Sequence, residues 1–165
     1  MIAATKYFVA SLAIGLANVV GAVNCVSGFP PSNADASYTD HGNGTVTDLR
    51  TGLMWSKCVE GQDAQNSCTG TPTTRTWSAA LGVAAAQQLG GYADWRLPNV
   101  KELRTLAEAC RVSPAINDAI FLGAGVAYVW SGTTVAANPS QAWRLNLDYG
   151  DSEKAANSIS TSIVQ

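Results

Sequence analysis

Short runs of β-branched and apolar residues, separated by turn residues, predict strands along much of the chain. Residues 38–55 contain the runs Thr-Val-Thr and Leu-Met-Trp, and the Gly- and Asn-containing turns beside them favour hairpins. Apolar and polar side chains alternate in residues 141–147, which indicates a half-buried strand. We expect further strands at 126–131 and 158–164 and a hairpin turn at 148–151.

Two segments have the 3.6-residue apolar period of helices. Residues 76–91 place an apolar stripe on one helical face, with Thr76 as the expected N-cap and a Gly-Gly pair as the stop. Residues 99–110 follow Pro98 and have a second apolar stripe, with Glu102 in the first turn. Two helices among many short strands predict an α+β domain.

The first 22 residues have the pattern of a secretory signal. Lys6 precedes an apolar run over 7–20, and Val20 and Ala22 are small residues at the −3 and −1 positions of a cut after Ala22. An uncleaved membrane anchor is the alternative, although a bilayer span needs roughly 20 apolar residues. Asn24 fits poorly with lipidation of Cys25. We therefore expect an exported protein, secreted, periplasmic or at the cell surface.

Removing this signal leaves one domain of ordinary size. The remaining 165 − 22 = 143 residues are divided here into an extended, surface-lying lead-in at 23–37 and a domain at 38–165. Charged residues are 13% of the chain, and loss of Lys6 moves the formal net charge from −2 to −3. No basic stripe is present, so nucleic acid is not an expected partner.

Four cysteines follow the signal, and an even number in an exported chain predicts disulfides. Three connectivities are open in principle. Cys58 and Cys68 flank a polar stretch, so their pairing would close a loop and leave Cys25 to pair with Cys110. A zinc site is the alternative, but the chain has no CxxC pair and its only histidine is His41.

Five segments, taken in order, resemble the Lcl C-terminal domain family, named for a collagen-like adhesin of Legionella. The segments are GNGTVTDLRTGLMW, GGYADWRLPNVKEL, PAIN, VWSGT and AWRLNLDYG. The resemblance implies a C-type-lectin-like fold with two helices around small twisted antiparallel sheets. It also implies a bacterial surface protein that binds ligands such as sulfated glycans, without catalytic residues. The family's closing arginine-bearing strand is replaced here by SISTSIVQ.

Tryptophan and polar residues in the C-terminal half form the expected ligand site. Aromatic faces stack on sugar rings, and C-type-lectin-like folds bind ligands in this half. The predicted site residues are Trp130, Trp143, Arg144, Asn146, Asp148 and Tyr149. Trp55, Trp77 and Trp95 are expected in the core instead.

The stretch around DWRLPNVKEL is expected to be structural, because a bidentate ion pair between Arg96 and Glu102 would lock a turn into the second helix. The residues assigned to this role are Trp95, Arg96, Leu97, Pro98, Glu102 and Leu103. Asp40, Asn43 and Asp48 offer oxygen ligands at a loose calcium-loop spacing, although a turn explains them more simply. Asn43 also begins a glycosylation acceptor pattern.

Catalysis is not expected, because His41 has no paired nucleophile and disulfide-bonded cysteines leave no reactive thiol. The leading hypothesis is an exported adhesion module that recognises a glycan or another surface polymer. The alternative is a structural subunit of a fibre, pilus tip or surface assembly with protein partners.

Overall fold

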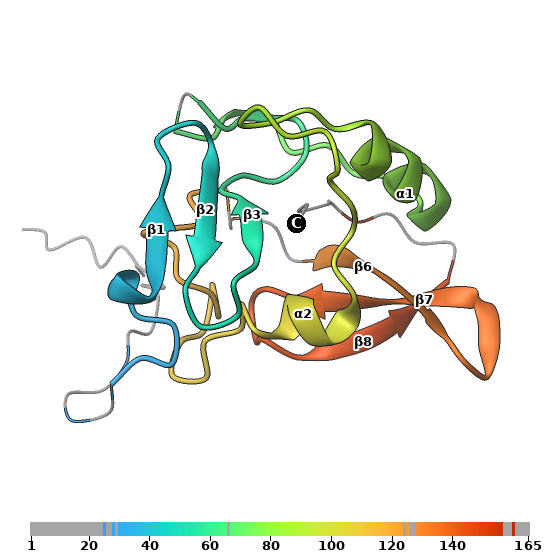
Figure 1. Cartoon of the computed structure of the whole chain (residues 1–165). Helices are drawn as coiled ribbons and strands as arrows, with labels where there is room; N and C mark the ends of the chain where they lie inside the picture. The colour runs from blue at the N-terminus through green and yellow to red at the C-terminus, as the bar shows by residue number, and fades with distance from the viewer. Residues whose placement is uncertain are drawn as a thin grey trace, which may run out of the picture.

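A computed structural model describes residues 25, 28, 30–65, 67–123, 125, 128–156 and 160, which form an α+β fold of two helices and three small antiparallel sheets (Figure 1). The elements are a 3-10 turn Asp35–Ser37, β1 Tyr38–Asp40, β2 Thr45–Asp48, β3 Met54–Ser56, β4 Gln62–Asp63, β5 Thr69–Gly70, α1 Trp77–Ala86, α2 Val100–Arg104, β6 Tyr128–Val135, β7 Asn138–Asn146 and β8 Ser152–Ala155. The predicted signal at 1–22 lies outside the described residues.

The predicted hairpins of residues 38–55 are present as the sheet β1-β2-β3. Val46 in the central strand pairs with Trp55, and both are fully buried. Gly44 ends the β1–β2 turn with a φ of 86°, and an added Cβ would lie 2.7 Å from the Cβ of Ala64. A side chain larger than hydrogen therefore does not fit at this turn.

The C-terminal sheet has the order β6-β7-β8, and its strands differ from the predicted ranges. β7 begins three residues before the predicted strand, and β8 was missed because its sequence, Ser-Glu-Lys-Ala, lacks an apolar pattern. The strand predicted at 158–164 lies outside the described residues except for Ser160, which forms a bridge with Arg75.

Both helices are shorter than predicted. α1 ends at Ala86, and Thr76 occupies the N-cap position without a capping hydrogen bond from its side chain. α2 begins with a capping box between Asn99 and Glu102 but ends at Arg104 rather than at residue 110. The apolar period continues beyond it, but Ala107 pairs with Ile116, so tertiary contacts override the helical pattern.

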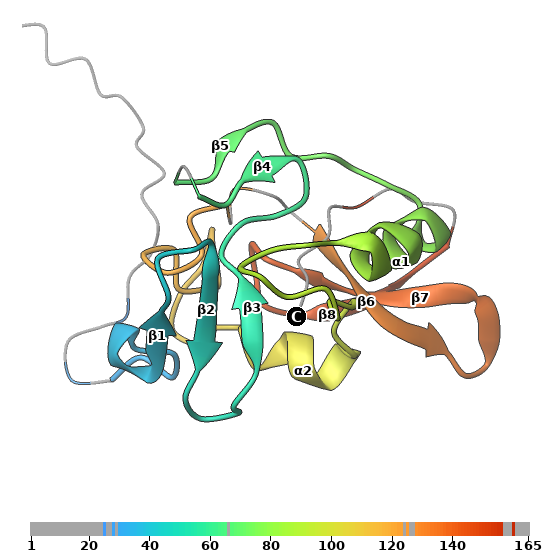
Figure 2. The same ribbon diagram turned by 45° about the horizontal axis from the view of Figure 1, so that its top comes forward.

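The C-terminal sheet separates two apolar clusters. Val129 and Leu145 contribute to one cluster with Leu103 of α2, whereas Trp130 and Ala142 contribute to the other with α1. Figure 2 accordingly shows α1 on one side of β6–β8 and α2 on the other. Both faces of this sheet are therefore covered near its centre.

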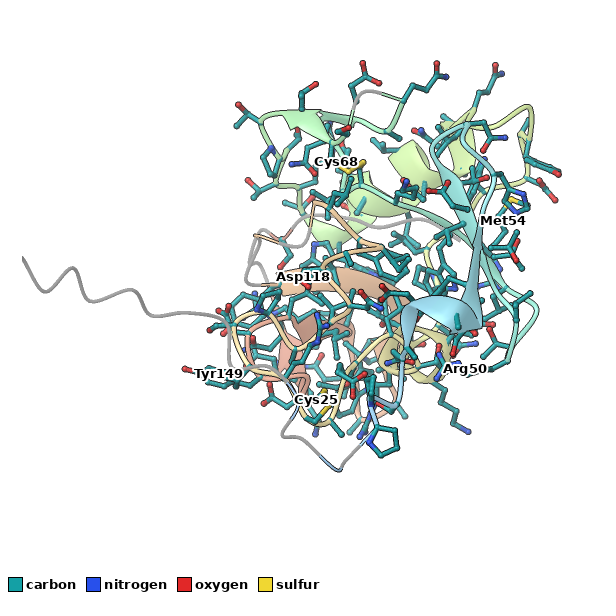
Figure 3. The ribbon with its side chains drawn as sticks, turned by 90° about the vertical axis from the view of Figure 1, so that its left-hand side faces the viewer. Cys25, Arg50, Met54, Cys68, Asp118 and Tyr149 are labelled. Atoms are coloured by element: carbon teal, nitrogen blue, oxygen red, sulfur yellow. A yellow bond between two sulfur atoms is a disulfide. The ribbon has the colours of Figure 1, made fainter. Side chains whose placement is uncertain are left out.

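The two expected disulfides are present, Cys25–Cys110 with a Cα–Cα distance of 4.7 Å and Cys58–Cys68 with 5.4 Å. They lie at opposite ends of the fold in the view of Figure 3. All four sulfurs are bonded in pairs, so no thiolate remains for the alternative zinc site. Among the described residues, no helix has the length and apolar character needed to cross a bilayer.

Candidate ligand-binding site

Arg144 of β7 is held by interactions within the sheet. It pairs with Glu153 of β8, and its Nε donates to Glu153 Oε1 over 2.7 Å. Its guanidinium lies 3.8 Å from the ring centroid of Tyr128, and Nη1 donates to Ser160 Oγ over 3.2 Å. These contacts fix the orientation of the side chain, which is only 15% exposed.

The other predicted site residues are divided between the two faces of the sheet. Trp130 pairs with Arg144 and is 1% exposed, so its ring offers little open surface to a ligand. Trp143 is half-buried on the opposite face, with the Lys154 ammonium 5.5 Å from its ring centroid. Alternation along a strand identifies residues that share a face but does not show which face meets solvent.

The remaining three predicted residues, Asn146, Asp148 and Tyr149, lie at the end of β7 and in the turn that follows it, and their exposure differs. Asn146 is 7% exposed, and its Oδ1 accepts a hydrogen bond from the Asp148 backbone N–H over 2.8 Å. Tyr149 is 69% exposed and projects outward at the tip of the turn (Figure 3). Asn146 is therefore a buried turn residue rather than a surface ligand residue, and the structure does not gather the six predicted residues into one site.

A groove between the start of α1 and the β6–β7 hairpin offers better binding geometry. This tryptophan groove has a volume of about 320 Å³. Its lining residues are Thr76, Trp77, Ser78, Trp130, Pro139, Ser140 and Ala155. It contains two indole rings and three hydroxyl groups, and none of its lining residues is charged.

Backbone carbonyls hold both indole rings of this groove. Trp77 Nε1 donates to the Ser131 carbonyl over 2.8 Å, and Trp130 Nε1 donates to the Arg75 carbonyl over 2.9 Å. Because both N–H groups already have partners, a ligand would contact the exposed ring surface of Trp77 and the hydroxyls rather than the indole N–H groups. The sequence placed Trp77 in the core and gave no indication of Pro139 or Ser140, because only the fold brings α1 to the hairpin.

The family segments GNGTVTDLRTGLMW and GGYADWRLPNVKEL meet at a different hollow. This hollow is formed by residues 52–54, 92 and 94–96 and has a volume of about 310 Å³. At its edge, Arg96 makes the expected bidentate ion pair with Glu102, and both contacts are 2.9 Å. Glu102 also accepts from the Asn99 backbone N–H over 2.7 Å. The Arg96 guanidinium lowers the pKa of Glu102, and the pair fixes the turn into α2.

Each residue of the proposed calcium loop has a protein partner. Asp40 Oδ2 lies 2.5 Å from Lys57 Nζ, and Asn43 Oδ1 accepts from the hydroxyl of Thr45 over 2.7 Å. The fully buried Asp48 accepts from the Arg50 guanidinium over 2.8 and 3.0 Å. Burial alone would raise the pKa of Asp48, but the bonds from Arg50 outweigh it and lower that pKa. These contacts stabilise the β1–β2 turn and the segment after β2, and calcium binding stays a prediction.

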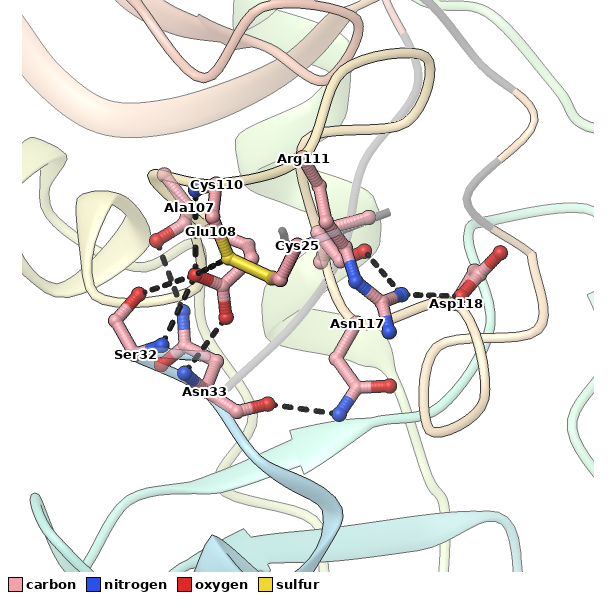
Figure 4. The surroundings of a disulfide bond; sticks show 10 residues. Cys25, Ser32, Asn33, Ala107, Glu108, Cys110, Arg111, Asn117 and Asp118 are labelled. Atoms are coloured by element: carbon pink, nitrogen blue, oxygen red, sulfur yellow. Dashed lines mark hydrogen bonds and ion pairs between the residues drawn. A yellow bond between two sulfur atoms is a disulfide. The ribbon is translucent and has the colours of Figure 1, made fainter. Parts of the chain in front are cut away.

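The segment before β1 is bound to the rest of the fold by a polar clasp, defined here as Ser32, Asn33, Glu108 and Asn117 (Figure 4). Glu108 is 2% exposed, and its two oxygens accept from the backbone N–H groups of Ser32 and Asn33 over 3.0 and 2.7 Å. Asn117 Nδ2 donates to the Asn33 carbonyl over 2.7 Å. Asn33 is only 1% exposed, so the prediction of a surface-lying lead-in is wrong at this residue.

The clasp also determines the ionisation of Glu108. Burial alone would raise the pKa of this carboxyl, but hydrogen bonds from Ser32, Asn33 and Cys110 outweigh burial and hold the pKa below its ordinary value. A buried carboxylate is stable only with such partners. The sequence gave no signal for Glu108, because its partners lie 75 and 76 residues away in the chain.

The fold and its grooves define a small α+β module stapled by two disulfides. The profile of the Lcl C-terminal domain matches residues 44–164, so the chain belongs to the Lcl C-terminal domain family, as the motifs predicted. This membership makes it a bacterial surface- or adhesin-associated module. No curated protein and no solved structure matches the chain.

Proposed function

We propose that this domain is an exported, C-type-lectin-like module that binds a neutral glycan in the tryptophan groove. The observation that carries the proposal is the fixed and partly exposed indole ring of Trp77 in an uncharged groove of about 320 Å³, whose lining also includes the buried Trp130. Family membership supports a surface role, and the signal pattern and disulfides support export.

The chemistry of a sugar ring fits this lining. A pyranose has an apolar face of C–H groups and a rim of hydroxyls, so it needs an aromatic surface beside small polar groups. Trp77 supplies partly exposed ring surface, and Ser78 and Ser140 supply hydroxyls at the rim. A groove without cations favours a neutral sugar over a sulfated one, in agreement with the lack of arginine in SISTSIVQ.

A glycan array followed by calorimetry on the best neutral hit tests the proposal. We expect Trp77→Ala to weaken binding by about tenfold, because the substitution removes the aromatic surface against which the apolar face of the sugar would lie. Trp143→Ala is the matched control, since this tryptophan lies on the other face of the sheet. Circular dichroism should show that both variants fold.

The opposite ranking would reject the tryptophan groove. If Trp143→Ala abolishes binding and Trp77→Ala leaves it unchanged, the site lies on the α2 face of the sheet. If no glycan binds at all, the lectin hypothesis fails.

The structural-subunit alternative is favoured by exposed apolar side chains, with Leu49 61% and Tyr149 69% exposed. Tyrosine is enriched at the contacts between protein chains. Sedimentation of the purified protein over a range of concentrations tests this alternative, because ordered self-assembly without glycan binding would support it.

A further inference from the structure

An irregular segment of β6 follows directly after Trp130 of the tryptophan groove. Trp130 pairs with Arg144 and Thr134 pairs with Ala142, so the three residues between them in β6 lie opposite one residue of β7. We call these three residues, 131–133, the β6 bulge. A bulge interrupts the ladder of backbone hydrogen bonds and changes the direction of the groups beside it. The backbone of the β6 bulge therefore bonds to other parts of the fold.

The hydroxyl of Ser131 holds the bulge against β7. The side chain is fully buried, and its Oγ donates to the Trp143 carbonyl over 2.8 Å. The same oxygen accepts from the Thr133 backbone N–H over 3.3 Å. One hydroxyl therefore joins the bulge to the neighbouring strand and also links the first and last residues of the bulge.

The other two residues of the bulge are bonded to the turn that leads into α2. The Gly132 N–H donates to the Pro98 carbonyl over 2.7 Å, and Thr133 Oγ1 accepts from the Val100 backbone N–H over 2.9 Å. A Cβ added at Gly132 would lie 3.1 Å from the Leu97 carbonyl oxygen, so the two segments are in close contact. Two of the family segments therefore meet at the β6 bulge.

The bulge also supplies the acceptor that orients the ring of Trp77. Trp77 Nε1 donates to the Ser131 carbonyl over 2.8 Å, and its partly exposed ring lines the tryptophan groove. The Thr76 side chain gives α1 no capping hydrogen bond, so contacts of Trp77 with the sheet help to place the start of this helix. Because the hydroxyl and the carbonyl belong to one residue, a shift of the Ser131 backbone would move the acceptor of the indole N–H.

We infer that Ser131 is a positioning residue of the tryptophan groove, which holds the Trp77 ring in the orientation that binds the sugar, and this role rests on the proposed function. A ring that is fixed before the sugar arrives loses little conformational freedom on binding, so its contact surface contributes more fully to affinity. Ser131 acts through Trp77, since it is not among the lining residues. Residues 131–133 of a family segment thus support binding although none of them lines the groove.

Ser131→Ala tests this role in the chain without residues 1–22, because it removes the hydroxyl and keeps the backbone carbonyl. We expect the indole N–H NMR signal of Trp77 to shift in the sugar-free protein. Affinity for the neutral array glycan that is used for Trp77→Ala should fall by about three- to tenfold, because the loosened ring has to be ordered on binding.

Ser56→Ala is the matched control. Ser56 is 5% exposed, and its Oγ also donates to a carbonyl, that of Cys58, over 2.8 Å and accepts from a backbone N–H, that of Cys58, over 3.3 Å. It lies in β3 and outside the lining of the tryptophan groove. Ser56→Ala should therefore lower the free energy of unfolding about as much as Ser131→Ala but leave the Trp77 signal and the glycan affinity unchanged.

A double variant separates positioning of the ring from general weakening of the fold. In the Trp77→Ala background, Ser131→Ala should cause no further loss of glycan affinity, because Ser131 acts through the ring. Trp77→Phe keeps an aromatic face and removes the N–H that Ser131 binds, so it should weaken binding as Ser131→Ala does. This variant keeps the test valid if Ser131→Ala fails to fold.

Four results overturn the role of Ser131. They are an unchanged Trp77 signal in Ser131→Ala, equal changes of signal and affinity in Ser56→Ala, additive losses in the double variant, and wild-type affinity in Trp77→Phe. If no neutral glycan binds the wild-type protein, the proposed function fails, whereas the sugar-free indole signal still decides whether Ser131 positions Trp77.

Discussion

The polar clasp and the C-terminal sheet are both buried, but they are held by different forces. In the clasp, the ionised Glu108 is surrounded by hydrogen-bond donors from a segment 75 residues away. In the sheet, Leu145 and Val129 are buried by α2, and Trp130 is buried on the α1 side. The stability of the clasp therefore depends on the charge of one carboxylate, whereas that of the sheet depends on apolar area.

This difference also separates residues that maintain the fold from residues available to ligands. The polar groups of the distinctive motifs are used internally, as in the Asp48–Arg50 and Arg96–Glu102 pairs. The hydroxyl groups around the tryptophan groove, from Thr76, Ser78 and Ser140, lie outside these motif segments. Because the charged side chains of these motifs already form ion pairs with each other, the motifs are a poor guide to where a ligand would bind on this protein.

The largest expected effect follows from opening the Cys25–Cys110 disulfide, which lies beside Glu108 of the clasp (Figure 4). Replacing Cys25 and Cys110 by serine should destabilise the fold by about 4.6 kcal/mol, because the disulfide closes a loop of 85 residues. The same change at Cys58 and Cys68 should cost about 2.7 kcal/mol, because that loop spans 10 residues. Urea unfolding of both double variants measures the two values, and a larger loss at Cys58–Cys68 would contradict the ranking.

The next effect is in the C-terminal sheet. Leu145→Ala should destabilise the protein by about 3–4 kcal/mol, since the fully buried leucine leaves a cavity between β7 and α2. The loss should be the same at neutral pH and at mildly acidic pH, because no ionisable group is removed. Urea unfolding at the two pH values measures it, and a strong pH dependence would mean that the sheet relies on charge after all.

A slightly smaller effect, about 3 kcal/mol at neutral pH, is expected for Glu108→Gln, because an amide donor would face the backbone N–H groups of the clasp. The folded pKa of Glu108 lies below the ordinary value of 4.5, so its contribution is complete above that pH and is lost as the pH falls through the folded pKa. The difference between wild type and variant should therefore shrink on acidification, in contrast to Leu145→Ala. A constant difference would show that Glu108 is not ionised in the fold.

Sequence patterns predicted the parts of the fold that depend on local chemistry. The hairpins around Gly44, the helix start at Asn99 and the two disulfides were all predicted, since turn residues and cysteine positions carry these signals. β8 and the short extent of α2 were missed, because partners distant in sequence determine them. The sequence also did not show that the predicted ligand residues are divided between two faces of the sheet, because Trp130 becomes part of a groove only when α1 lies across its sheet face.

The Cys25–Cys110 disulfide has a mechanical consequence. Tension applied to the chain ahead of Cys25 passes through the sulfur–sulfur bond to Cys110 and does not stretch the 84 residues between them, since the two cysteines are 85 positions apart. Helix α1 and the β1–β3 sheet lie in that shielded stretch, and Asn117 of the clasp is hydrogen-bonded to it. These elements would therefore stay folded under a pulling force that their noncovalent contacts alone would not withstand.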